Sequence, residues 1–221
     1  MGIDMRKYKH FLFDMDGTLI DSIPFIVEAF QRTFEKVLGK REEDEEAVRG
    51  CIGLPLVKSF TRYPPEYCDV LVSTYIKQYG LLQQEQTIPM FDGIYDMLTG
   101  LREQGAEIAI VTSKRIDPTV ELMEMHGFND IVSALVCRED CKEGKPSPEP
   151  VEVAMRKLDT TDKSQVLFIG DSIHDLRCAK NAGVDCAMCD WTRMDKDELR
   201  EAQPEHWLTD PSQLLELVIA D

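Results

Sequence analysis

The chain has 221 residues, of which 43% are hydrophobic and 30% are charged, as in folded globular proteins and unlike disordered ones. Its formal net charge of −16 argues against nucleic acids and anionic membrane surfaces as partners, because both are negatively charged themselves. A site for an anionic ligand on such a chain needs local positive charge, from lysine or from a metal ion.

The composition also indicates a cytoplasmic protein. No run of about 18 apolar residues is present, so no membrane span is expected, and the first residues lack the apolar core of a signal peptide. The seven cysteines favour reduced thiols over a disulfide framework. Cys186 and Cys189 are three residues apart in an expected strand, so their thiols should point to opposite faces rather than share a metal.

The first expected strand, residues 11–13, is followed by a block without a strand pattern. Segments 24–38 and 66–79 are amphipathic and predict helices, and the charged segment 40–46 is a turn or a helix start. We therefore expect a helical cap domain at residues 20–86, inserted after the first strand, with hinges near residues 19–22 and 87–89.

Strands and helices alternate in the remainder of the chain. This alternation predicts an α/β fold with a doubly wound parallel (Rossmann-like) sheet, formed by a catalytic core of residues 1–19 and 87–221. The further expected strands are 107–111, 131–136, 166–169 and 184–189, and the expected helices are 92–104, one from 117 to about 127, 148–158 and 172–182.

Two acids follow the first expected strand. Asp14 and Asp16 stand in the segment Asp-Met-Asp-Gly-Thr, residues 14–18. Ligands of open parallel sheets bind beyond the carboxyl ends of the strands, where both acids would lie. The structural alternative is an Asx turn with a helix cap, for which Asp, Gly and Thr are also usual.

Three later loops carry polar residues, each with a structural alternative. Thr112 and Ser113 follow the second strand and could hold phosphate oxygens, or simply cap a helix. Lys145 stands in a loop stiffened by two prolines, although most single lysines are solvated surface charges. Asp171 and Asp175, four residues apart after a glycine, suit a hard cation with oxygen ligands, or again a helix cap.

Together, and in this order, the four segments resemble the motifs of the haloacid dehalogenase-like hydrolase superfamily. The corresponding motifs are D-x-D-G-T at residues 14–18, a hydrophobic run that ends in Thr112, K-P-x-P from Lys145, and the acids of G-D-x-x-x-D at Asp171 and Asp175. The match covers nearly the whole chain. The helical insertion resembles the small cap of the phosphoglycolate phosphatase, pyrophosphatase and β-phosphoglucomutase-like branch.

The resemblance implies a role for each acid. Asp14 would be the nucleophile that forms an aspartyl-phosphate, and Asp16 would protonate the leaving oxygen and then activate water. Mg²⁺ would bind the Asp14 carboxylate, the Asp16 backbone carbonyl and Asp171, with Asp175 as a direct or an indirect ligand.

The resemblance also implies how the phosphoryl group is held. Thr112, the Ser113 backbone and Lys145 would bind its oxygens, and Mg²⁺ and Lys145 would supply the positive charge that the acidic surface lacks. Asp16 favours phosphate-ester hydrolysis, because the dehalogenases of the superfamily lack an Asp at this position and the P-type ATPases carry Thr.

The expected activity is that of a Mg²⁺-dependent phosphatase, phosphoglycolate phosphatase-like, acting on a small phosphorylated metabolite. A phosphomutase and an inorganic pyrophosphatase are alternatives within the same chemistry. A catalytically silent binding protein is the alternative from another class, but the site acids and Lys145 are all present. Phosphoglycolate, pyrophosphate, sugar phosphates and nucleotide monophosphates remain open as substrates, and the protein would be a monomer or a homodimer.

The segment at residues 49–56 resembles the cap loop with which this branch recognises the leaving group. We expect Arg49 and Lys58 to meet an anionic group of the substrate, with Gly53 between them, although a flexible hinge explains the glycines equally well. His174 is expected to face solvent at a helix start rather than to act in catalysis.

Overall fold

The computed structural model describes residues 8–42 and 44–219, and it confirms the predicted α/β class. Within these residues, all five strand pairings are parallel and give one sheet of six strands in the order β3-β2-β1-β4-β5-β6. The strands are β1 His10–Phe13, β2 Glu107–Val111, β3 Ala134–Val136, β4 Val166–Gly170, β5 Asp185–Cys189 and β6 His206–Leu208.

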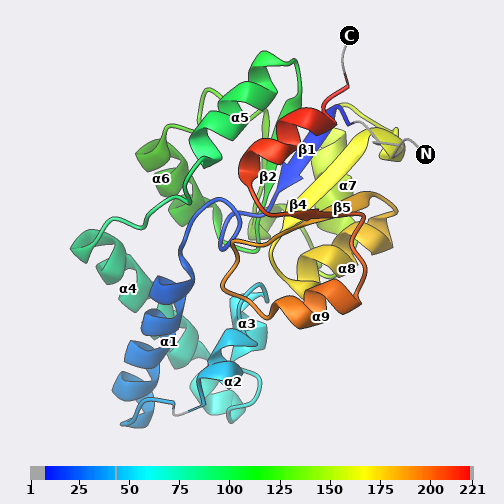
Figure 1. Ribbon diagram of the computed structural model, residues 1–221. Coiled ribbons are helices and arrows are strands. Elements are labelled where there is room, and N and C mark those ends of the chain that lie inside the picture. Colours follow the sequence, from blue (N-terminus) through cyan, green and yellow to red (C-terminus); the bar gives the residue numbers. More distant parts are fainter. Residues whose placement is uncertain (1–7, 43, 220–221) are drawn as a thin grey trace.

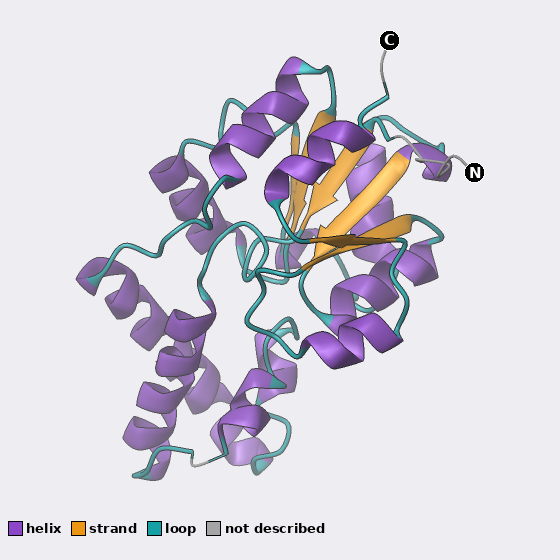
Figure 2. Cartoon of the chain, viewed as in Figure 1, coloured by secondary structure: helices purple, strands orange, loops and turns teal. Residues whose placement is uncertain are grey.

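Helices cover both faces of this sheet (Figures 1 and 2). They are α5 Ile94–Glu103, α6 Ile116–His126, η1 Arg138–Asp140, α7 Glu149–Lys157, η2 Lys163–Gln165, α8 Ile173–Ala182, α9 Lys196–Glu201 and η3 Pro211–Leu217. Side chains of successive strand residues point to opposite faces, so Phe11 and Phe13 pack in one hydrophobic cluster with α5, α6 and η3. Leu12 packs on the other face in a second cluster with α7, α8 and α9.

The sequence analysis did not predict β6. This strand has three residues, and its first two are only partly buried. An edge strand of this length has no apolar run that distinguishes it from a loop. Pairing with β5 through Ala187, Met188 and Cys189 defines it instead.

In the described part of the chain between β1 and α5, the structure has four helices. They are α1 Ile23–Leu38, α2 Glu45–Arg49, α3 Leu56–Ser59 and α4 Pro65–Glu85, and α1 packs along α4. The rings of Phe30, Phe34, Phe60 and Tyr75 form their common centre, with centroids 4.6–6.4 Å apart. Of the charged segment 40–46, residue 43 lies outside the described residues, and α2 begins at Glu45.

The chain passes between this helical block and the sheet at two adjacent places. The N–H of Asp21 donates to the Pro89 carbonyl (2.8 Å), and that of Phe91 donates to the Leu19 carbonyl (3.2 Å). These backbone hydrogen bonds hold the two crossings side by side. The division into a core and a cap at residues 20–86 stays a prediction.

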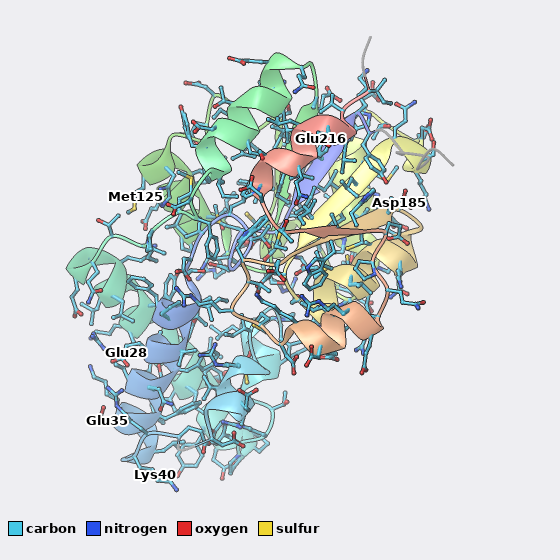
Figure 3. The ribbon with its side chains drawn as sticks, in the orientation of Figure 1. Glu28, Glu35, Lys40, Met125, Asp185 and Glu216 are labelled. Carbon is cyan, nitrogen blue, oxygen red and sulfur yellow. The ribbon has the colours of Figure 1, made fainter. Side chains whose placement is uncertain are left out.

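The seven cysteines are free thiols. Cys186 and Cys189 pack in different hydrophobic clusters, one on each face of the sheet, so they cannot converge on one metal ion. Among the described residues, no helix is long and apolar enough to cross a membrane. The acidic charge is spread widely: Figure 3 shows Glu28 and Glu35 on α1 and Glu216 at the opposite end of the molecule.

Candidate active site

The site lies at the carboxyl ends of neighbouring strands, on the side of the sheet that faces the helical block (Figure 2). Asp14 follows β1, Thr112 follows β2 and Asp171 follows β4. Because β1 pairs in parallel with both β2 and β4, these residues meet at one edge. Backbone N–H groups of Asp14 and Thr112 donate to the carbonyls of Ile169 and Val136, both at 2.9 Å, which anchors the two residues to the sheet.

Three of the predicted acids form a buried cluster. Asp14, Asp171 and Asp175 each offer a carboxylate oxygen, and these oxygens lie within 4.8 Å of one another. Burial raises the pKa of Asp14 to about 7, although Lys145 lowers it. Burial and the neighbouring Asp175 and Asp14 also raise the pKa of Asp171 well above its ordinary value. A raised pKa means that the surroundings of a carboxylate disfavour its ionised form. A bound cation would supply the positive charge that stabilises this form.

Lys145 is buried against two of these acids. Its ammonium lies 2.6 Å from Oδ1 of Asp14 and 2.6 Å from Oδ1 of Asp175. Burial opposes the charge of Lys145, but the two carboxylates outweigh this effect and raise its pKa. The structural alternative of a solvated surface lysine is therefore wrong for Lys145, and a positive charge is fixed beside Asp14.

Asp175 has hydrogen-bond partners on both carboxylate oxygens. Its Oδ2 accepts from the hydroxyl of Ser172 (2.6 Å), from the backbone N–H of Ser172 (3.1 Å) and from that of Asp171 (3.3 Å). Ser172 in turn caps α8 by accepting from the backbone N–H of Asp175. Asp175 is thus part of the capping box of α8 and also part of the site. It contacts both Lys145 and the loop that carries Asp171.

Gly17 is required by the close approach of Asp171. Its φ is +85°, and a Cβ at this position would overlap the Asp171 carboxylate. The same carboxylate accepts a hydrogen bond from Thr192 (2.9 Å), in the loop after β5. The sequence analysis missed Thr192, because that loop carries no motif and only the fold brings it to Asp171.

Asp16 lies beside the three buried acids and has partners of its own. Its Oδ1 accepts from the hydroxyl of Ser22 (2.6 Å), and its Oδ2 lies 3.1 Å from the ammonium of Lys114. Lys114 also donates to the hydroxyl of Tyr79 on α4 (3.1 Å). The sequence analysis missed all three partners. Lys114 follows Thr112 and Ser113 directly, so its place in that motif was the one signal available.

Thr112 and Ser113 are placed differently from each other. Thr112 is buried, and its hydroxyl accepts from the backbone N–H of Lys114 (3.1 Å). The N-cap of the following helix is Arg115, so the helix-cap alternative for Thr112 is wrong. The hydroxyl of Ser113 donates to the carbonyl of Gly53 (3.0 Å), which joins this loop to the helical block.

Comparison with known proteins agrees with this geometry. The family described as haloacid dehalogenase-like hydrolase matches residues 11–189. The chain belongs to the haloacid dehalogenase-like hydrolase family. The resemblance drawn from the motifs is thereby confirmed, and so is the prediction of an enzyme of the hydrolase class.

Two relatives of this hydrolase carry the same name. "Pyrophosphatase PpaX" of Halalkalibacterium halodurans is 33% identical over 94% of this chain and 95% of its own length. "Pyrophosphatase PpaX" of Listeria monocytogenes serotype 4b is 30% identical over 96% of this chain and 97% of its own.

Solved structures share the fold over almost the full length. A protein from Bacteroides fragilis, described provisionally as a haloacid dehalogenase-like hydrolase, superposes with a TM-score of 0.85 at 27% identity, covering 94% of this chain and 100% of its own. A protein from Lactobacillus plantarum, described provisionally as a phosphoglycolate phosphatase, gives 0.84 at 23% identity, covering 96% and 99%. At that identity the second likeness shows the fold alone.

The predicted specificity residues of the hydrolase lie in the segment from α2 to α3. Gly53 lies over the site loops, with φ +84° and its carbonyl bonded to Ser113. Arg49 instead lines a cavity of 710 Å³ between α2, the start of α8 and the loop before α9. Lys58 is exposed on α3. The role of Arg49 and Lys58 in substrate selection stays a prediction.

His174 is half-buried rather than facing solvent, which corrects the expectation for this residue. It lines the same cavity as Arg49, and a Cβ at Gly53 would lie 3.4 Å from its ring. Burial lowers the pKa of His174, so the ring is neutral near pH 7. The cap loop covers this helix start, which the sequence pattern could not show.

We expect Gly17→Ala to reduce turnover by about 10²-fold, because the added methyl group displaces the Asp171 carboxylate and misplaces the site. Gly105→Ala is the matched control. Gly105 has a similar φ of +82°, but nothing lies within 4 Å of its Cβ position. Both variants should lose about 1–2 kcal/mol of unfolding free energy from backbone strain. Equal activity of the two variants would mean that the contact with Asp171 is unimportant.

Proposed function

We propose that this hydrolase is a Mg²⁺-dependent phosphatase that cleaves a small phosphorylated metabolite through an aspartyl-phosphate on Asp14. One observation carries the proposal. Asp14 is buried with one carboxylate oxygen on the ammonium of Lys145 and with Asp171 close by. A carboxylate held in this way can present its other oxygen to phosphorus, while Lys145 offsets the charge of the transferring group.

The donor set fits Mg²⁺. Carboxylate oxygens are the ligands that this ion prefers, and the acids are close enough to share one ion. Both oxygens of Asp175 already accept hydrogen bonds, so we assign the direct contacts to Asp14 and Asp171 and an orienting role to Asp175. The backbone carbonyl of Asp16 would complete the protein ligands, as in the family. A bound ion supplies charge compensation for the phosphoryl oxygens.

The residues then divide the reaction into two steps. Asp14 attacks phosphorus, the bond from phosphorus to the leaving oxygen breaks, and Asp16 gives that oxygen a proton. In the second step Asp16 takes a proton from water, the water oxygen attacks phosphorus, and the bond to Asp14 breaks. Thr112, the Ser113 backbone and Lys145 hold the phosphoryl oxygens throughout.

The helical block serves as the cap in this proposal. Ser113 is hydrogen-bonded to Gly53, and Lys114 is hydrogen-bonded to Tyr79. The loop after β2 is therefore already in contact with the helical block. Closure of residues 20–86 over the loops would exclude water from the reacting groups. The free thiols support a cytoplasmic location.

Pyrophosphate is the first substrate candidate, because the two relatives named above are called pyrophosphatases and match nearly the whole chain at 30–33% identity. Phosphoglycolate is the second candidate, and it shares a small, anionic leaving group. The test is turnover of pyrophosphate, phosphoglycolate, a sugar phosphate and a nucleotide monophosphate by the purified chain with Mg²⁺. Absence of phosphate release from all four would contradict the proposal.

Mg²⁺ should stabilise the protein through the buried acids. At an ion concentration of about 100 times the dissociation constant, we expect the melting temperature to rise by about 5–10 °C. Asp171→Asn should lose the rise, whereas Asp69→Asn, at an exposed position on α4, should keep it. Chelation should abolish turnover. An equal rise in both variants would place the ion elsewhere.

This stabilisation should depend on pH. The pKa of Asp14 is raised to about 7 in the folded chain from an ordinary value of 3.8, so without the ion the folded state keeps a proton that the unfolded state has lost. The contribution of Asp14 to stability therefore falls as pH rises from 3.8 to 7. Mg²⁺ binds the ionised form, so its apparent affinity should rise by up to about tenfold per pH unit up to pH 7. Titrations at pH 5.5 and 7.5 with equal affinities would exclude Asp14 as a ligand.

A further inference from the structure

A second, largely buried lysine contacts the site at Asp16, and the reaction steps above do not use it. Lys114 follows β2, and its side chain is 11% exposed. The ammonium lies 3.1 Å from Oδ2 of Asp16 and 3.1 Å from the hydroxyl of Tyr79, and it is 4.3 Å from the centre of the Tyr79 ring. Asp16 and Tyr79 outweigh the effect of burial and raise the pKa of Lys114, so the group is a cation at neutral pH.

Lys114 and Tyr79 each have a hydrogen-bond donor without an acceptor among the described residues. A lysine ammonium has three N–H donors, and two of them go to Asp16 and Tyr79. Within residues 8–42 and 44–219, neither the third N–H of Lys114 nor the O–H of Tyr79 has a hydrogen-bond acceptor. Burial raises the pKa of Tyr79, so its hydroxyl keeps that proton. Buried donors beside an anion-cleaving site are suited to an anionic ligand.

The position of Asp16 indicates which part of the substrate would reach these donors. In the proposed reaction Asp16 contacts the leaving oxygen, and Lys114 contacts Asp16. Groups attached to the leaving oxygen therefore come within reach of Lys114 and Tyr79. Lys145 contacts Asp14 and Asp175 instead of Asp16, and in the proposed reaction it binds the phosphoryl oxygens rather than the leaving group.

We propose that Lys114 and Tyr79 together bind the anionic part of the leaving group, and that they restrict the hydrolase to substrates whose leaving group carries a phosphate or a carboxylate. The inference rests on the proposed function and adds to it the residues that select the substrate. Binding moves the ammonium from Asp16 to the substrate, which frees Oδ2 of Asp16 to face the leaving oxygen. Tyr79 belongs to α4, so the same contact draws the cap helix onto the substrate.

The neighbouring ring supports this role for Tyr79. Tyr75 stacks on it with centroids 6.1 Å apart and an interplanar angle of 20°. Tyr75 in turn packs on Phe30 in the centre of the helical block, at 4.6 Å. The Tyr79 hydroxyl is therefore held in place by packing before substrate arrives, which lowers the entropy cost of binding.

The turnover experiment compares two classes of substrate. Pyrophosphate and phosphoglycolate have an anionic leaving group, and phenyl phosphate has a leaving group without a further charge. Lys114→Met should lower kcat/KM for the first two by about ten- to hundredfold more than for phenyl phosphate, mainly through KM. Tyr79→Phe should give a selective loss of about two- to tenfold. Lys77→Met and Tyr67→Phe are the controls, because both residues lie at exposed positions of α4, the helix that carries Tyr79.

A binding experiment removes the dependence on turnover. Methylenediphosphonate carries a second phosphonate in place of the leaving group, and methylphosphonate lacks it. The wild-type chain with Mg²⁺ should bind the first more tightly in calorimetry, and Lys114→Met should remove most of this preference. A preserved preference, or an equal loss for all substrates, would overturn the assignment. If the preference is lost as expected while no phosphate ester is hydrolysed, the proposed function alone fails.

Discussion

Asp14→Asn should abolish turnover, with a reduction in kcat of at least about 10⁴-fold for every substrate. The amide cannot form the aspartyl-phosphate, and neither Lys145 nor the metal can replace a nucleophile. The variant should fold normally, because burial disfavours the charge that the substitution removes. Without Mg²⁺, its melting temperature near pH 8 should equal or exceed that of the wild type.

The measurement is steady-state phosphate release together with a thermal melt of each variant. Asp69→Asn removes one charge from an exposed position and is the matched control, with unchanged activity expected. Activity of Asp14→Asn within tenfold of the wild type would show that another group attacks phosphorus. The aspartyl-phosphate mechanism would then have to be abandoned.

Asp16→Asn should lower kcat by about 10²–10⁴-fold while substrate still binds, because proton transfer to the leaving oxygen and from water is lost. The loss should be smaller in the first step for p-nitrophenyl phosphate, whose leaving group departs without protonation. The amide keeps a hydrogen-bond acceptor for Ser22 or Lys114, so the loop should stay in place.

Burst kinetics separate this role from that of Asp14. With p-nitrophenyl phosphate, Asp16→Asn should release one equivalent of nitrophenol rapidly and then stop at the phosphorylated enzyme, since water is no longer activated. Asp14→Asn should show no burst. If Asp16→Asn turned over all substrates at the wild-type rate, Asp16 would be a structural residue that holds Ser22 and Lys114.

The sequence predicted the acids of the site because their motifs depend on local geometry. In a parallel sheet, residues directly after neighbouring strands meet at one edge, so Asp14 and Asp171 could be placed together without knowing any side-chain contact. Gly17 belongs to the same local pattern. Thr192, which also contacts Asp171, does not belong to that pattern, because the loop after β5 reaches Asp171 only through the order of the strands.

The sequence by itself determined the family, the α/β class and the alternation of strands and helices, and it predicted residues that would bind a phosphoryl group. These properties follow from the period of the apolar residues and from short motifs at strand ends, which act over a few residues. The tertiary structure alone decided which partners complete the site. Lys114 with Tyr79 and Ser113 with Gly53 are contacts across the boundary between the helical block and the sheet, and residues from both sides of that boundary line the cavity that holds Arg49. Such contacts depend on how two packed units meet in space, and no local pattern of residues encodes that.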